Sequence, residues 1–134
     1  MLIFIYFFNI YKILKRMNCY ITNSNNDLVP FFLELAVSNE QKRIGLMHRS
    51  YLSDRHGMLF IYDEPYNSTI WMKNTEIPLD ILFIDENFII NCIKYGKPFD
   101  ETIISCNSNT KYVIELSYGT CAKYNIVPGS KLII

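Results

Sequence analysis

The side chains best suited to binding or chemistry gather in one short stretch of the sequence. An indole offers a flat apolar surface with one N–H donor, and a cation, an amide and a carboxylate supply polar contacts. Together they could line a pocket for a small polar ligand. Alternatively, the amide, hydroxyl and carboxylate hydrogen-bond the backbone of an irregular loop that Pro78 forces. The residues are Trp71, Lys73, Asn74, Thr75 and Asp80.

A second carboxylate, Glu115, stands in the strand-like run Y-V-I-E-L-S. Strand alternation puts it on the opposite face from its apolar neighbours, which predicts an exposed face of a half-buried sheet. The alternative places it beside the same pocket, paired with Lys73 or Arg49. If Asp80 and Glu115 converged, the carboxylate pair could do acid–base work, as in a hydrolase, or hold a cation.

The sequence offers little for metals or cofactors. His48 and His56 stand eight positions apart without an H-E-x-x-H pattern, and no two cysteines form a C-x-x-C pair. We therefore expect no metal site and no cofactor. Cys92 and Cys106 lie in apolar stretches that could become neighbouring strands, so a disulfide is one alternative. We expect instead that the cysteines are small core residues.

The elements that must position these side chains are mostly short strands. Alternating or apolar runs between Gly, Pro, Asn and Asp predict strands at 31–37, 58–62, 69–73, 79–85, 88–95, 102–106, 111–117 and 131–134. Pro65 should end the second of these, and Glu86-Asn87 suggests a hairpin turn. Ser38 and Gln41 form a capping box for a short helix reaching His48 or Arg49, with Ile44, Leu46 and Met47 turned inward. A helical turn is expected within 118–124.

The composition bounds the fold and the partners. A chain of 134 residues with 50% hydrophobic and 15% aromatic residues predicts one domain rich in strands. We expect a mainly β (α+β) fold, a small antiparallel β-barrel-like or sandwich domain with one or two short helices. Thirteen basic residues balance thirteen acidic ones, which argues against nucleic acid as a partner.

The N-terminal 27 residues differ from the rest. Residues 1–11 are almost entirely apolar, basic residues follow by position 16, and 18–27 is polar, which predicts a linker into a domain spanning 28–134. Residues 1–16 could be a degenerate export signal or anchor, an interfacial segment at a membrane, or translated sequence upstream of a true start at Met17. The first two alternatives favour the cell envelope over the cytoplasm.

Several sequence blocks, in order and at similar spacing, resemble one known family. They are Gly45-Leu46-Met47 with Arg49, Gly57-Met58-Leu59-Phe60, Trp71 to Thr75 running into Ile77 to Ile81, Phe83-Ile84-Asp85, Ile114-Glu115-Leu116 with Gly119, and the closing Ile126, Gly129 and Leu132. From about Phe31 to Leu132 the chain resembles the domain-of-unknown-function family 192 of bacteria and archaea. This resemblance implies a compact β-rich domain, often exported or membrane-anchored, and no known reaction. At Ser130 the family usually has an acidic residue, so no role of that carboxylate carries over.

These observations favour a binding or accessory module whose partner is a small polar ligand or an extended segment of a protein. A carboxylate-dependent hydrolase and a structural interaction scaffold are the alternatives. The surroundings of Trp71, Asn74 and Asp80 discriminate among them, because burial of all three with internal partners and no adjoining pocket would leave no site there.

Overall fold

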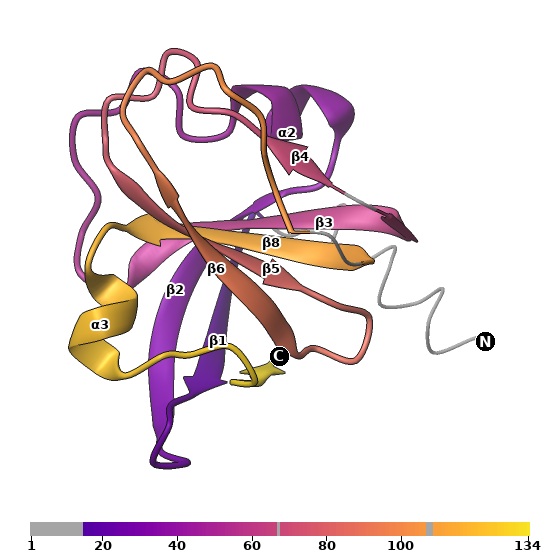
Figure 1. Cartoon of the computed structure of the whole chain (residues 1–134), viewed down its shortest axis with the longest axis vertical. Coiled ribbons are helices and arrows are strands. Elements are labelled where there is room, and N and C mark those ends of the chain that lie inside the picture. Colours follow the sequence, from indigo (N-terminus) through magenta and orange to yellow (C-terminus); the bar gives the residue numbers. More distant parts are fainter. Residues whose placement is uncertain (1–14, 67, 107–108) are drawn as a thin grey trace.

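A single curled sheet dominates the computed structural model, which describes residues 15–134 except 67, 107 and 108 (Figure 1). The sheet has seven strands in the order β6-β5-β8-β3-β2-β1-β9, and all neighbours are antiparallel except β2 and β3. The strands are β1 (Arg16–Thr22), β2 (Leu28–Ala36), β3 (His56–Tyr66), β5 (Leu79–Ile84), β6 (Ile90–Gly96), β8 (Thr110–Ser117) and β9 (Leu132–Ile133). A separate two-stranded sheet pairs β4 (Thr69–Ile70) with β7 (Ile104–Ser105).

The sheet curls far enough for its two end strands to meet at one end. The Ile90 N–H donates to the Ser130 carbonyl (2.9 Å), and the Leu132 N–H donates to the Phe88 carbonyl (2.8 Å). These bonds join the start of β6 to the segment that contains β9. The expectation of a mainly β fold with barrel-like curvature and short helices is confirmed.

The two faces of the sheet are buried by different parts of the chain. The inner face packs side chains of nearly every strand into one core, which includes Phe31, Leu82 and Ile114. The outer face of β3, β5 and β8 packs under a cover formed by residues 46–52, 69–78 and 104–106, with Phe60, Ile81 and Val113 in the second core. Because both faces are covered, all six residues of β5 are buried. Each fully buried large apolar side chain stabilises the fold by about 1.5–3 kcal/mol.

The capping box at Ser38 begins helix α2 (Asn39–Ile44), as predicted. The Gln41 N–H donates to Ser38 Oγ (3.1 Å), and the Ser38 N–H donates to Gln41 Oε1 (2.9 Å). The helix ends earlier than expected, because Gly45 adopts a positive φ. Leu46 is buried as predicted, whereas Ile44 is 41% exposed, so its inward placement was wrong. The helical turn expected near the C-terminus is α3 (Thr120–Tyr124).

Three predicted segments differ from the structure. Part of the predicted polar linker is strand β1, which pairs with β2 and β9 and inserts Cys19 and Ile21 into the inner core. Strand β3 continues past Pro65, with an irregular register between Ile61 and Tyr66, so the proline does not end it. The strand predicted for 69–73 is only β4, because its partner β7 is equally short.

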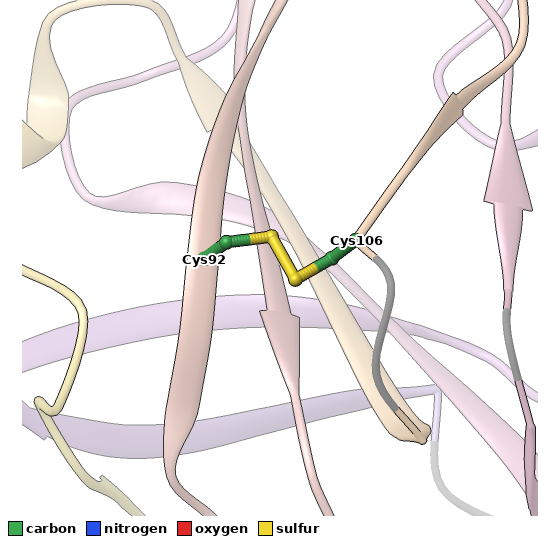
Figure 2. The surroundings of a disulfide bond; sticks show 2 residues. All are labelled: Cys92 and Cys106. Atoms are coloured by element: carbon green, nitrogen blue, oxygen red, sulfur yellow. A yellow bond between two sulfur atoms is a disulfide. The ribbon is translucent and has the colours of Figure 1, made fainter.

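A disulfide joins Cys92 of β6 to Cys106, just after β7 (Figure 2). The prediction that these two cysteines are merely small core residues was therefore wrong. Their Cα atoms lie 6.2 Å apart, so the residue that follows β7 lies beside β6. The disulfide thus fastens the cover of the outer face to the main sheet. Cys19 and Cys121 are free and buried, in agreement with the core interpretation, and burial raises the pKa of the Cys19 thiol to about 12.

The interpretations of residues 1–16 concern a segment that lies almost wholly outside the described residues, which begin at residue 15. In the described part of the chain, no helix has the length and apolar character needed to cross a bilayer.

Candidate functional site

A pocket of about 270 Å³ opens between helix α2, the outer face of β3 and β8, and the segment that follows β4. Figure 1 shows α2 and β4 lying together at one end of the molecule, beyond β3 and β8. The pocket combines apolar walls with polar and charged groups, which is the usual character of ligand sites. Its lining residues are Asn39, Lys42, Arg43, Ile44, Gly45, Leu46, Met47, Phe60, Tyr62, Thr69, Ile70, Trp71, Thr75 and Glu115.

One wall of the pocket is formed where α2 ends. Gly45 has φ = +49°, a conformation that side-chain-bearing residues rarely adopt, and a Cβ there would lie 3.2 Å from Phe60 Cζ. The glycine therefore lets the chain turn sharply while passing close to the Phe60 ring. The turn buries Leu46 and leaves the helix itself, with Lys42 and Arg43, beside the opening.

The opposite wall is the segment from Trp71 to Thr75, called the signature segment from here on, and Met72 anchors it. The Met72 side chain is completely buried against Gly96, where a Cβ would lie only 2.6 Å from its Sδ. The Met72 N–H donates to the Asp100 carbonyl (2.8 Å), and the Thr75 N–H donates to the Met72 carbonyl (3.1 Å), which closes a tight turn. With Met72 fixed, Trp71 stays 39% exposed on the pocket and Thr75 lies buried within it.

Backbone hydrogen bonds from two neighbouring loops hold the tip of this segment. The His48 N–H donates to the Asn74 carbonyl (2.9 Å), and the Phe99 N–H donates to the Thr75 carbonyl (3.0 Å). Asn74, His48 and Phe99 all have positive φ, which costs non-glycine residues energy and persists where surrounding contacts impose it. The segment is therefore held in one shape from both sides.

The carboxyl group in the pocket lining belongs to Glu115, on the sheet side of the pocket. Its strand neighbours are Met58 on β3 and Ile81 on β5, and the side chain is 5% exposed. Among the described residues, no side chain forms an ion pair or hydrogen bond with this carboxyl group. Burial without a partner raises its pKa to about 8, because the charged form loses its hydration. Burial therefore favours the uncharged form of Glu115, which lines the pocket.

The structure brings Trp71, Thr75 and Glu115 together from among the predicted candidates. The prediction of an exposed face for Glu115 was wrong, because α2 and the signature segment cover that face of β8. Glu115 is part of the pocket lining, but the alternative that it pairs with Lys73 or Arg49 is not observed among the described residues. Lys73 lies over the Trp71 ring instead, with its Nζ 5.1 Å from the ring centre.

Arg49 and Asn74 lie outside the pocket lining. The Arg49 guanidinium forms a bidentate ion pair with Glu34 of β2. Asn74 is exposed and contributes its backbone carbonyl to the hydrogen bond with His48. Both residues therefore act as supports for the fold around the signature segment.

Asp80 has a structural role on the opposite face of the sheet. It pairs with Leu116 in the register of β5 and β8, one position away from Glu115, so the two carboxyl groups point to opposite faces and do not converge. Asp80 Oδ2 accepts a hydrogen bond from the Cys121 N–H (2.9 Å) in the first turn of α3. The carboxylate pair considered for acid–base chemistry is therefore absent.

Sequence reasoning missed Lys42 and Tyr62. Lys42 Nζ lies 4.5 Å from the centre of the Tyr62 ring, a cation–π contact at the edge of the pocket. Burial lowers the pKa of the Lys42 ammonium, an effect that Asp63 opposes. The capping box predicted the helix that carries Lys42, but no local signal showed which part of the sheet that helix would cover.

The histidines and the remaining acidic groups form no metal cluster in the part of the chain that the structure describes. His56 Nδ1 lies 3.0 Å from the Asp54 carbonyl, and the His48 side chain is exposed. Ser130, where the resemblance leads one to expect an acidic residue, is buried, and its Oγ accepts a hydrogen bond from the Val127 N–H (3.2 Å). It supports the turn before β9 and is not part of the pocket lining.

Comparisons with known proteins give the family and the fold. The chain is similar to the crystal structure of a protein described as a candidate transcription regulator from Sinorhizobium meliloti 1021, with 35% identity, a TM-score of 0.85, and coverage of 87% of this chain and 92% of that one. It is also similar to a protein of unknown function from Novosphingobium aromaticivorans DSM 12444, with 33% identity, a TM-score of 0.84, and coverage of 89% and 85%. No curated protein matches. The model of the domain-of-unknown-function family DUF192, described as "uncharacterized ACR", matches residues 20–134, and the chain therefore belongs to this family.

Proposed function

We propose that this domain is a small-ligand-binding module and that its ligand occupies the pocket between α2, β3, β8 and the Trp71–Thr75 segment. One observation carries the proposal: the Glu115 carboxyl group is buried, lines the pocket and has no partner among the described residues. A buried polar group without a hydrogen bond costs about 1–3 kcal/mol of stability. A ligand that hydrogen-bonds the Glu115 carboxyl group would gain affinity from that bond.

The rest of the pocket suits a small ligand. Its volume lies just below the range of about 300–1,000 Å³ that is typical of ligand sites. Trp71 offers a partly exposed indole at the pocket, against which an apolar face of a ligand can pack. The rigid support of the signature segment by two loops keeps these groups in place before a ligand arrives, which lowers the entropic cost of binding.

An extended segment of a partner protein is the less favoured occupant. Strand addition needs a free sheet edge, and at the start of β6 that edge is already occupied by hydrogen bonds of Phe88 and Ile90 with Leu132 and Ser130. The pocket on the outer face needs no free edge. We therefore place the ligand there, and an accessory role at the cell envelope remains a proposal that rests on the apolar N-terminal segment alone.

A hydrolase is the second candidate, because Glu115 is in the protonation state that a general acid needs at neutral pH. The missing second carboxylate weighs against it, since Asp80 lies on the other face of the sheet. Turnover of a ligand found by binding, with loss of turnover in Glu115→Gln, would favour the hydrolase over the binding module.

The test is a thermal-shift screen of the full chain against a metabolite library. A true ligand raises the melting temperature, and at a concentration of 100 times Kd it stabilises the fold by about 2.7 kcal/mol. Trp71→Ala should reduce this response. Tyr51→Ala is the matched control, because it also removes an exposed aromatic side chain (75% exposed) but lies outside the pocket. The proposal fails if no compound raises the melting temperature, or if the ligand raises the melting temperatures of Trp71→Ala and Tyr51→Ala by the same amount.

A further inference from the structure

The neighbours of Glu115 define what kind of group the pocket can receive at its deep end. Apolar side chains flank the carboxyl group on both sides, Met58 from β3 and Ile81 from β5. On the covering side it shares the pocket with Trp71 and Thr75, and the Thr75 hydroxyl donates to the Lys73 carbonyl (3.0 Å). A ligand that reaches this depth therefore meets the Glu115 carboxyl group as the polar group still to be satisfied.

Cationic side chains lie in the pocket, but they are engaged elsewhere. Arg43 forms a bidentate pair with Glu40 on the surface of α2, at 2.7 and 3.1 Å. The Lys42 ammonium lies over the Tyr62 ring, and its pKa is raised by the charge of Asp63 and lowered by that of Lys111. Three titratable side chains line the pocket besides Glu115. Tyr62 comes from β3, and Lys42 and Arg43 come from α2, while residues 69–75 add no titratable group to the lining. None of these groups pairs with Glu115 in the described structure, so burial is what favours its uncharged form.

We propose, on the basis of the ligand-binding function above, that the pocket takes an uncharged ligand whose deep end both donates and accepts a hydrogen bond, such as a carboxamide or an alcohol. A protonated carboxyl group has one O–H donor and a carbonyl acceptor side by side. A carboxamide matches both at once, with its carbonyl accepting from the O–H and its N–H donating to the carbonyl. An ammonium group has three donors and no acceptor, so it would be matched only after Glu115 had released its proton to water, and it would enter a pocket that already contains Lys42. A carboxylate could accept from the O–H but could return no hydrogen bond.

The experiment uses ligands of one shape and three charges, namely benzamide, benzylamine and benzoate, with isobutyramide, isobutylamine and isobutyrate as an aliphatic set. Binding to the uniformly ¹⁵N-labelled full chain is followed by the shifts of backbone amide signals and of the Trp71 indole N–H signal. We expect the amides to bind most tightly at pH 7. Their affinity should fall about tenfold between pH 7 and pH 9, because Glu115 loses its proton over that range.

Two substitutions of Glu115 test whether its neutral donor and acceptor hold the ligand. Glu115→Gln keeps a neutral donor and acceptor in place, so amide binding should persist within about threefold and lose its dependence on pH. Glu115→Leu removes both hydrogen-bonding atoms, and we expect it to lose amide binding by at least tenfold. Glu86→Gln, an exposed glutamate in the β5–β6 hairpin, is the matched control and should behave like the natural chain.

The outcomes distinguish the inference from the function on which it rests. Preferred binding of the amines, or loss of binding in Glu115→Gln, overturns the uncharged-ligand inference while leaving a ligand-binding pocket. Preferred binding of the acids does the same. If none of the six compounds shifts the signals of pocket residues at millimolar concentration and the metabolite screen also finds nothing, both the inference and the proposed function fail.

Discussion

Replacing Glu115 with Gln should make the domain more stable at high pH and change little at low pH. The side chain is buried without a partner among the described residues, and its carboxyl pKa rises from an ordinary 4.5 to about 8. In the unfolded chain the carboxyl group regains water and its ordinary pKa. Between those two values the folded state holds a proton that the unfolded state has released.

The sign of the pH dependence follows from this difference. Stability rises with pH where the unfolded state binds more protons, and here the folded state binds more, so stability falls as pH rises. The fall is about 1.4 kcal/mol per pH unit and ends as the pH passes the folded-state pKa. Relative to Glu115→Gln, the free energy of unfolding of the natural chain should be lower by less than about 1 kcal/mol at pH 5, by about 3 kcal/mol at pH 7 and by about 5 kcal/mol at pH 9.

Such a loss is large beside the 5–15 kcal/mol of stability that is typical of a folded domain. Urea titrations of the full chain at pH 5, 7 and 9 measure it as the difference between the two proteins. Any pH-independent effect of the glutamine amide on stability cancels when the differences between the two proteins at two pH values are compared. Glu86→Gln, which changes an exposed glutamate, should run parallel to the natural chain throughout. An equal difference between Glu115→Gln and the natural chain at pH 5 and pH 9 would refute the reasoning.

Three further substitutions or treatments test the supports of the site. Gly57→Ala should destabilise the fold by about 3 kcal/mol or more in urea titration, because its Cβ would lie 2.2 Å from a backbone carbonyl oxygen of β8; an unchanged midpoint would contradict this close approach. Asp80→Ala should cost about 1–3 kcal/mol, since it leaves the Cys121 N–H without its acceptor, and should leave ligand affinity unchanged; a specific loss of affinity would return Asp80 to the site. Reduction of the Cys92–Cys106 disulfide should lower stability by about 3 kcal/mol, as expected for a closed loop of this length, and free-thiol counting with and without reductant checks that the bond is present.

The sequence alone determined the local elements and the direction of side chains within each strand. Alternation in 79–85 and 111–117 put Asp80 with Leu82 and Ile84, and Glu115 opposite Ile114, and the registers of β5 and β8 agree. The capping box at Ser38 located the start of α2, because the hydrogen bonds that form it are made within four residues. The family could also be recognised from the sequence, because its blocks are defined by the order and spacing of residues.

Only the tertiary structure decided which of these side chains share a site. Alternation says that Glu115 and its apolar neighbours lie on opposite faces of β8, but it cannot say what covers either face. Here α2 and the Trp71–Thr75 segment, both far from Glu115 in sequence, cover the outer face and make it a pocket. The same long-range packing places Asp80 beside the Cys121 N–H, Arg49 beside Glu34, and Cys92 beside Cys106. Contacts between distant segments depend on how the whole sheet curls. For that reason Trp71 and Thr75 line a pocket, whereas Asp80, a few residues later, anchors the first turn of α3.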